Sequence, residues 1–180
     1  MESEKLLITQ LQNQQTQDKA FRILMGLYKE RLYWHIRNIV KTHDDADDVL
    51  QNTFIKVYRS ISKFKGDSKL YSWMYRIATN EAITHINKRA RVQNISIEDV
   101  QHQLADSLHA DNYFNGDEIQ EKLQKALVAL PQKQQLVFNM KYFENMKYGA
   151  ISDVLGTSVG ALKASYHHAV KKIEHHLTQS

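Results

Sequence analysis

Apolar residues recur every three or four positions along most of this chain, which is the spacing of one face of a helix. Residues 19 to 41 hold such a stripe at Phe21, Leu24, Leu27, Tyr28, Leu32, Ile36 and Ile39. The alternating pattern of a half-buried strand never extends beyond four residues. We therefore expect an all-α protein, with either one large helical core or two small ones.

A second helix is predicted to begin near Asp44 or Asp45, because acidic side chains complement the positive N-terminal end of a helix. Its apolar stripe comprises Ala46, Val49, Leu50, Thr53, Val57 and Ile61. The face that this stripe leaves free carries Asp48, Gln51, Asn52 and Ile55. Polar side chains beside an exposed isoleucine suit protein docking, although an ordinary solvated helix face has the same spacing.

Residues 63 to 68 are expected to form a loop, with Asp67 or Ser68 capping a third helix over residues 70 to 89. Aromatic residues interleave with cations here, at Phe64, Tyr71, Trp73 and Tyr75 and at Lys63, Lys65, Lys69 and Arg76. Single-stranded nucleic acid binds such surfaces, because rings stack on bases and cations hold phosphates. Asn80 adds an amide that can bond to a base edge. The alternative is a core Trp73 among solvated lysines.

The C-terminal third has the pattern of a helix-turn-helix. After a helix over residues 118 to 129, Pro131 marks the start of another, and a short helix over residues 147 to 155 ends at Gly156. Ser158 is a good N-cap for the last helix, whose apolar stripe is Leu162, Tyr166, Ala169, Ile173 and Leu177. Its opposite face, with Gly160, Lys163, Ala164, His167, His168 and Lys171, suits the DNA major groove. An ordinary amphipathic hairpin is the alternative.

Charge is distributed in blocks. The net charge of the 180 residues is only +4, but residues 53 to 91 hold nine Lys or Arg against two acids. Residues 92 to 121 hold seven acids and no Lys or Arg. A basic block of this length can face a polyanion. Residues 93 to 116 lack a clear period, so we expect a flexible acidic linker between a domain over 1–92 and a domain over 117–180.

Other function classes receive less support from the sequence. The chain has no cysteine, so disulfides and cysteine-bound zinc are excluded. No apolar run approaches the roughly 20 residues of a membrane span, and no signal peptide is visible; a cytoplasmic protein is expected. Asp44, Asp45 and Asp48 match the spacing of a magnesium site in helical isoprenoid synthases, but a second acidic motif is missing. We expect no enzyme activity, no catalytic residue, no metal and no cofactor.

Taken together, these segments resemble the sigma factors of bacterial RNA polymerase. ADDVLQNTFIKVYRSISKFKGDS and YSWMYRIATNEAI are similar to region two of that family, and LPQKQQLVFNMKYFENMKYGAISDVLGTSVGALK is similar to region four. The resemblance covers roughly residues 20 to 91 and 118 to 177. Because only these two regions and a short linker are present, the chain resembles the extracytoplasmic-function (ECF) group.

The resemblance implies roles for particular residues. The face that grips the coiled coil of the polymerase clamp would be Asp48, Gln51, Asn52 and Ile55. The surface that captures the minus-ten element would be Lys56, Lys63, Phe64, Lys65, Trp73, Arg76, Asn80, Lys88 and Arg89. The helix face that enters the major groove of the minus-thirty-five element would be Ser158, Val159, Gly160, Lys163, Ala164, His167 and His168.

The sequence thus predicts a sigma factor that binds core RNA polymerase and recognises and melts promoter DNA, both duplex and single-stranded. An anti-sigma factor is a further expected partner, membrane insertion is not expected, and the expected location is the cytoplasm, at the nucleoid. The alternative is a conventional dimeric helix-turn-helix regulator, which has no use for a strand-capturing surface.

Overall fold

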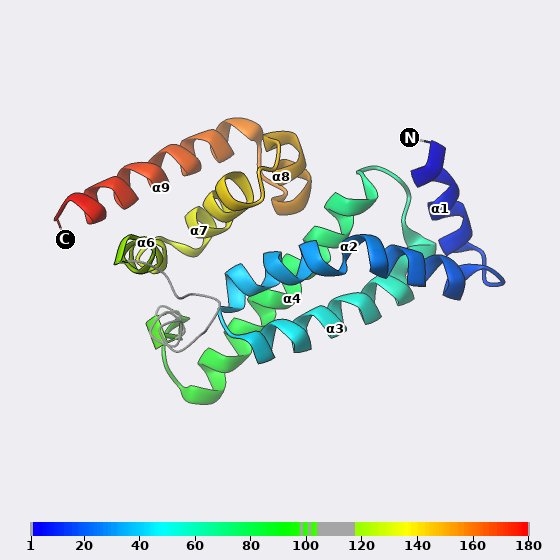
Figure 1. Ribbon diagram of the computed structural model, residues 1–180, viewed down its shortest axis with the longest axis horizontal. Coiled ribbons are helices and arrows are strands. Elements are labelled where there is room, and N and C mark those ends of the chain that lie inside the picture. Colours follow the sequence, from blue (N-terminus) through cyan, green and yellow to red (C-terminus); the bar gives the residue numbers. More distant parts are fainter. Residues whose placement is uncertain (1, 98, 101, 104–117, 180) are drawn as a thin grey trace.

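The computed structural model describes residues 2–97, 99–100, 102–103 and 118–179, and the regular structure in these ranges is helical (Figure 1). The N-terminal bundle consists of α1 (Glu2–Gln12), α2 (Gln17–Val40), α3 (His43–Ser60), a 3₁₀ turn η1 (Ile61–Lys63) and α4 (Leu70–Gln93). The C-terminal bundle consists of α6 (Glu118–Val128), α7 (Gln132–Phe138), a π-helical turn η4 (Asn139–Phe143), α8 (Tyr148–Leu155) and α9 (Val159–Gln179). The all-α prediction is confirmed.

Helices α2, α3 and α4 pack on one another to form the centre of the N-terminal bundle (Figure 1). The apolar stripe predicted for α3 is buried along its whole length, from Ala46 to Ile61. The helix begins at His43, one or two residues before the predicted start, because the Thr42 hydroxyl accepts a hydrogen bond from the Asp45 backbone amide and acts as the N-cap. The two faces of α3 therefore separate cleanly into a core side and a solvent side.

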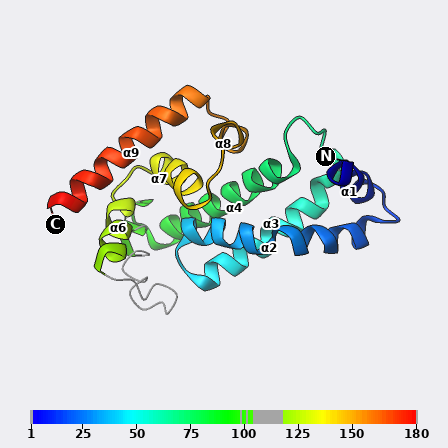
Figure 2. The ribbon, with the colours of Figure 1, turned by 45° about the horizontal axis from the view of Figure 1, so that its top comes forward.

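Helix α1 packs on α2 and on the η1 turn at the end of α3. Leu11 is fully buried in the main hydrophobic cluster, and Leu7 and Ile8 pack against that cluster. In Figures 1 and 2, α1 lies at one end of the bundle, beside the loop that joins α3 to α4. This helix is therefore an integral part of the bundle.

The C-terminal bundle contains the predicted helix-turn-helix. Pro131 is the N-cap of α7, and the Gln135 side chain donates to the Val128 and Leu130 carbonyls at the end of α6. Gly156 ends α8 in the left-handed conformation, with φ 62°, which glycine adopts without steric cost. The Ser158 hydroxyl then accepts from the Ala161 amide in the first turn of α9. The turn predicted between the two helices is confirmed.

The two bundles are packed against each other. One hydrophobic cluster runs from the N-terminal bundle into Leu136, Met140, Ile151 and Val154, while a second cluster holds α9 against α6 and α7. Helix α8 contacts α4, and η4 contacts α2 (Figures 1 and 2). The linker predicted over residues 93 to 116 lies largely outside the described residues, and only its first residue, Gln93, belongs to α4. The expectation of a flexible linker is wrong for its described start, because Val100 is fully buried in the main hydrophobic cluster and Ile95 and Ile97 pack against that cluster. In the described parts, the two cores are joined.

Polar contacts reinforce the packing between the bundles. The buried His35 of α2 places Nδ1 2.8 Å from Glu144 Oε1 and Nε2 2.8 Å from Thr79 Oγ1. Burial and then the negative charge of Glu144 raise the pKa of Tyr75. The Asn139 amide also donates to the Asn38 carbonyl at 3.4 Å. None of these pairings follows from the local sequence pattern, because each joins residues that are far apart in the chain.

Candidate nucleic-acid interface

The four residues predicted to bind core polymerase lie together on the exposed face of α3. Asp48, Gln51, Asn52 and Ile55 are all solvent-exposed, and 40% of Ile55 is accessible. The buried stripe on the opposite side of α3 fixes this orientation, since a helix that buries one face must present the other. The structure therefore brings these four side chains to one surface.

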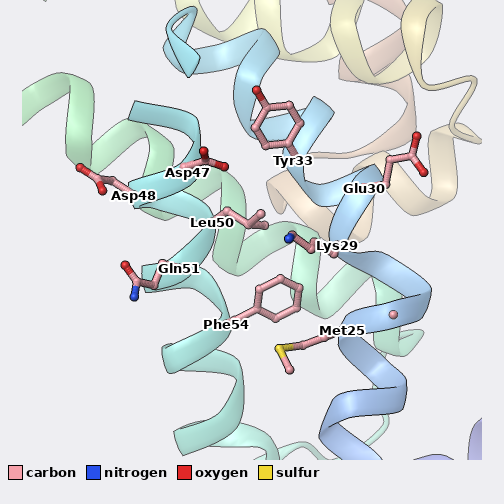
Figure 3. A pocket seen from close by; sticks show the side chains of 10 residues that line it. Met25, Lys29, Glu30, Tyr33, Asp47, Asp48, Leu50, Gln51 and Phe54 are labelled. Carbon is pink, nitrogen blue, oxygen red and sulfur yellow. The ribbon is translucent and has the colours of Figure 1, made fainter. Parts of the chain in front are cut away.

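A groove of about 840 Å³ runs beside this face, between α2 and α3. Figure 3 shows Met25, Leu50 and Phe54 pointing into the space between the two helices, while Asp48 and Gln51 lie on the outer side of α3. The lining residues are Met25, Gly26, Lys29, Glu30, Tyr33, Asp47, Asp48, Leu50, Gln51 and Phe54. An apolar floor with charged residues at the rim is the usual composition of a protein-docking surface. Sequence reasoning missed the α2 side of this groove.

The loop before α4 forms a smaller pocket of about 240 Å³. Its lining residues are Lys63, Phe64, Lys65, Asp67, Ser68, Trp73, Arg76 and Asp153. Lys63 and Lys65 are exposed, and Trp73 is half-buried. The Phe64 ring is only 8% exposed, because it packs against Trp73 with ring centroids 5.1 Å apart. The Phe64 ring therefore packs against Trp73 and offers little surface for stacking on a base.

Arg76 links this pocket to the C-terminal bundle. Its guanidinium donates through Nε, at 2.9 Å, and through Nη2 to the Asp153 carbonyl near the end of α8. The predicted minus-ten surface therefore borders α8, the first helix of the helix-turn-helix. Asn80, one turn further along α4, is exposed.

Two other predicted DNA-binding cations are engaged in ion pairs within the N-terminal bundle. Lys56 on α3 pairs with Glu81 on α4. Arg89 Nη1 lies 3.2 Å from Asp45 Oδ2, and His85 Nε2 lies 2.9 Å from the other oxygen of that carboxylate. Asp45 therefore links the start of α3 to α4 through these two contacts. This is a structural role, and it replaces the magnesium-binding role that its spacing in the sequence suggested. Lys88 is exposed on the same stretch of α4.

The last helix presents the predicted recognition face to solvent. Leu162, Ala169 and Ile173 are buried on its inner side. The exposed residues of the opposite face are Ser158, Val159, Gly160, Lys163, Ala164, His167 and His168. The Lys163 ammonium lies 6.0 Å from the centroid of the Tyr148 ring, a distance at which cation–π attraction contributes weakly. All the predicted major-groove residues thus share one accessible surface.

Within the ranges that the structure describes, acidic residues and histidines form no cluster of three that could hold a metal ion. In the same ranges, no helix is both long enough and apolar enough to cross a bilayer.

Comparison with known proteins identifies both halves of the chain. A family model for sigma-70 region 2 matches residues 24–92, and a model for sigma-70 region 4 matches residues 120–173. The RNA polymerase sigma-H factor of Pseudomonas aeruginosa is 30% identical over 183 residues, which cover 93% of this chain and 95% of that protein. The ECF RNA polymerase sigma-E factor of Haemophilus influenzae is 28% identical, with 89% of each chain covered.

Two solved structures have the same fold at 20% identity. One is CnrH in complex with the cytosolic domain of CnrY, with a TM-score of 0.71 over 98% of each chain. The other is the sigma factor RpoE in complex with the anti-sigma factor NepR from Bartonella quintana, with a TM-score of 0.67 over 89% of this chain and 98% of that chain. The match to both regions, in order and over nearly the full length, shows that this chain belongs to the RNA polymerase sigma factors, in the ECF group.

Proposed function

We propose that the protein acts through three separate surfaces when it directs RNA polymerase to a subset of promoters. The exposed face of α3, together with the groove beside it, binds core polymerase. The loop pocket and α4 capture an unpaired strand of the minus-ten element. The exposed face of α9 enters the major groove at the minus-thirty-five element. In this proposal the protein works by binding and has no reaction of its own.

The observation that carries the proposal is the combination of two different nucleic-acid surfaces on one chain. The α9 face suits duplex DNA, whereas the pocket around Trp73, Lys63 and Lys65 combines a ring with cations and suits a single strand. Taking a base out of the stack costs a few kcal/mol, and this pocket offers stacking and charge to offset that cost. A dimeric regulator of duplex DNA needs only the first surface.

An anti-sigma factor is the second kind of partner that we propose. The two solved relatives are bound to other proteins, one of them named as an anti-sigma factor. The apolar groove between α2 and α3 lies next to the proposed polymerase-binding face. A protein that occupied this groove would compete with core polymerase, since both partners would use adjoining residues of α3.

The test is capture of core polymerase, followed by sequencing of the 5′ ends of the transcripts that the complex starts. Asp48→Arg should weaken core binding by about tenfold or more, because it reverses a charge at the centre of the proposed interface. Glu174→Arg makes a similar charge change on the exposed side of α9 and should leave core binding intact. Tight, sequence-specific binding of duplex DNA by the free protein would instead favour the dimeric regulator.

A further inference from the structure

Helix α1 lies outside the segment that matches sigma-70 region 2, yet it holds both ends of the loop that carries the proposed strand-capturing residues. At the first end, the Gln12 side-chain amide donates to the Phe64 carbonyl at 2.8 Å and to the Ile61 carbonyl at 3.2 Å. Both amide hydrogens of one side chain are thus used on the η1 turn. Lys63 lies between the two carbonyls that Gln12 binds.

The second end of the loop is held by Glu4. Its Oε1 accepts a hydrogen bond from the Leu70 backbone amide, at 3.2 Å, in the first turn of α4. Neither Asp67 nor Ser68 caps this helix, contrary to the sequence-based expectation, and its N-cap Lys69 makes no side-chain capping bond. The first amides of a helix need acceptors from elsewhere, and α1 supplies one across 66 positions of sequence.

Helix α1 is a firm base for these two contacts. Leu11, the residue before Gln12, is fully buried. The turn that follows is closed by the Thr16 hydroxyl, which donates to the Gln10 carbonyl at 2.7 Å. Helix α1 also packs along α2 and on the η1 turn. The position of α1 relative to the loop is therefore fixed on several sides.

We propose that α1 is a positioning element for strand capture, in which Gln12 and Glu4 set the shape of residues 61–70 before DNA arrives. This inference rests on the proposed role of the loop in binding the minus-ten strand. A loop that is already ordered in the free protein binds more tightly, because binding then loses no further conformational entropy by ordering it. Gly66, at φ 79°, makes a sharp bend between the two held ends. Lys63, Lys65 and the Phe64–Trp73 pair thereby keep one arrangement.

The test compares matched variants in holoenzyme reconstituted with core polymerase, on a promoter found by mapping its transcripts. Gln12→Met keeps the length of the side chain and removes both donors, and the residue is exposed, so no cavity is formed. Glu4→Met removes the acceptor at the other end, whereas Glu4→Gln keeps an acceptor oxygen. Gln14→Met, in the exposed turn after α1, is the control for the chemical change.

Gln12→Met and Glu4→Met should each reduce permanganate reactivity of the melted minus-ten region, and binding of its isolated single strand by holoenzyme, by about fivefold. That is the scale of losing one net hydrogen bond, and Gln12→Met, which loses two, should show at least this reduction. Binding to core polymerase should not change, and Glu4→Gln and Gln14→Met should stay within about twofold of the natural protein. The recovery in Glu4→Gln separates the geometric role of the acceptor from the charge.

Lys63→Ala distinguishes a failure of the positioning role of α1 from a failure of the proposed strand-capturing role of the loop. If Lys63→Ala weakens strand binding while Gln12→Met and Glu4→Met do not, the positioning role of α1 is overturned and the role of the loop stands. If Lys63→Ala also has no effect, the loop itself is not the strand-capturing surface, and this inference fails with it. Equal losses of core binding and strand binding in Gln12→Met would mean a general structural role for α1 and would overturn the positioning role.

Discussion

At the scale of single residues, Lys41 is an ionisable side chain that is almost fully buried. It ends α2 in the left-handed conformation, at φ 69°, and only 7% of it is exposed. Its ammonium lies 3.4 Å from the Gln124 side-chain oxygen on α6. Burial, and then the nearby charge of Arg37, lower the pKa of Lys41 to about 8.

This shift predicts a pH-dependent stability difference between the natural protein and Lys41→Met. Since the ordinary lysine pKa is 10.5, the unfolded chain binds a proton between pH 8 and 10.5 that the folded chain does not. Stability therefore falls as the pH drops through this window and is level below it. Lys41→Met keeps the backbone strain and removes the titration.

The variant should be the more stable protein at pH 7, by up to about 3 kcal/mol at roughly 1.36 kcal/mol per pKa unit, and the difference should vanish near pH 11. Urea unfolding of both proteins at pH 7, 9 and 10.5 measures this. A stability difference that stays constant over the range would contradict the assigned pKa.

At the scale of elements, two glycines have opposite roles. Gly26 lies within α2, where an added Cβ would meet no atom within 4 Å, and Gly156 ends α8 at a positive φ of 62°. Glycine costs a helix interior roughly 1 kcal/mol relative to alanine, whereas an L-residue in the left-handed conformation costs roughly 1–2 kcal/mol. The same substitution should therefore change stability in opposite directions.

Gly26→Ala should raise the free energy of unfolding by about 1 kcal/mol, and Gly156→Ala should lower it by about the same amount or more. Chemical denaturation of both variants tests this, with each serving as the control for the other. Gly156→Ala should also weaken use of the upstream promoter element, because it loosens the turn between α8 and α9. Stabilisation by both substitutions would mean that the turn does not depend on a left-handed residue.

At the scale of the whole molecule, the packing of the two bundles bears on the proposal that one chain binds both promoter elements at once. The minus-ten and minus-thirty-five elements are about 25 base pairs apart, on the order of 85 Å at roughly 3.4 Å per base pair. In this structure α8 contacts α4, and Arg76 is bonded to the Asp153 carbonyl. If α4 and α9 bind these two elements at the same time, as we propose, the bundles have to separate and Arg76 has to exchange its partner.

Energy transfer between dyes measures this separation. The chain has no cysteine, so Arg31→Cys on α2 and Lys147→Cys, between η4 and α8, give two labelling sites, both exposed and on either side of the contact between the bundles. Transfer should be higher in the free protein than in the complex with core polymerase and promoter. The pair Ser3→Cys and Arg59→Cys, within the N-terminal bundle, should not change. Equal transfer in the free and bound forms would show that the bundles do not move apart.

The contact between His35 and Glu144 should control the same equilibrium. Glu144→Leu leaves Nδ1 of the buried His35 without its partner, which costs free energy in the closed form only, whereas Glu144→Gln retains an acceptor. Glu144→Leu should therefore lower energy transfer in the free protein and raise its affinity for core polymerase.

Much of this fold could be predicted from the sequence, because helices depend on residues three or four positions apart. The stripes of α2, α3 and α9, the turn at Gly156 and the faces that carry Asp48 and Lys163 follow from such local patterns. The resemblance to sigma factors over the same segments added the role of each face. These predictions needed no knowledge of the path of the chain.

Contacts between groups that are distant in sequence follow from the packing of the helices. The burial of the Phe64 ring, the two hydrogen bonds of Gln12 and the contact of His35 with Glu144, 109 positions away, depend on where whole helices lie. A side-chain amide or carboxylate has no periodicity that reveals its partner, so Gln12 is indistinguishable in sequence from the neighbouring glutamines. Local sequence patterns thus specify the helices and their exposed faces, whereas the packing of those helices specifies which loops are held in one shape and which surfaces are covered.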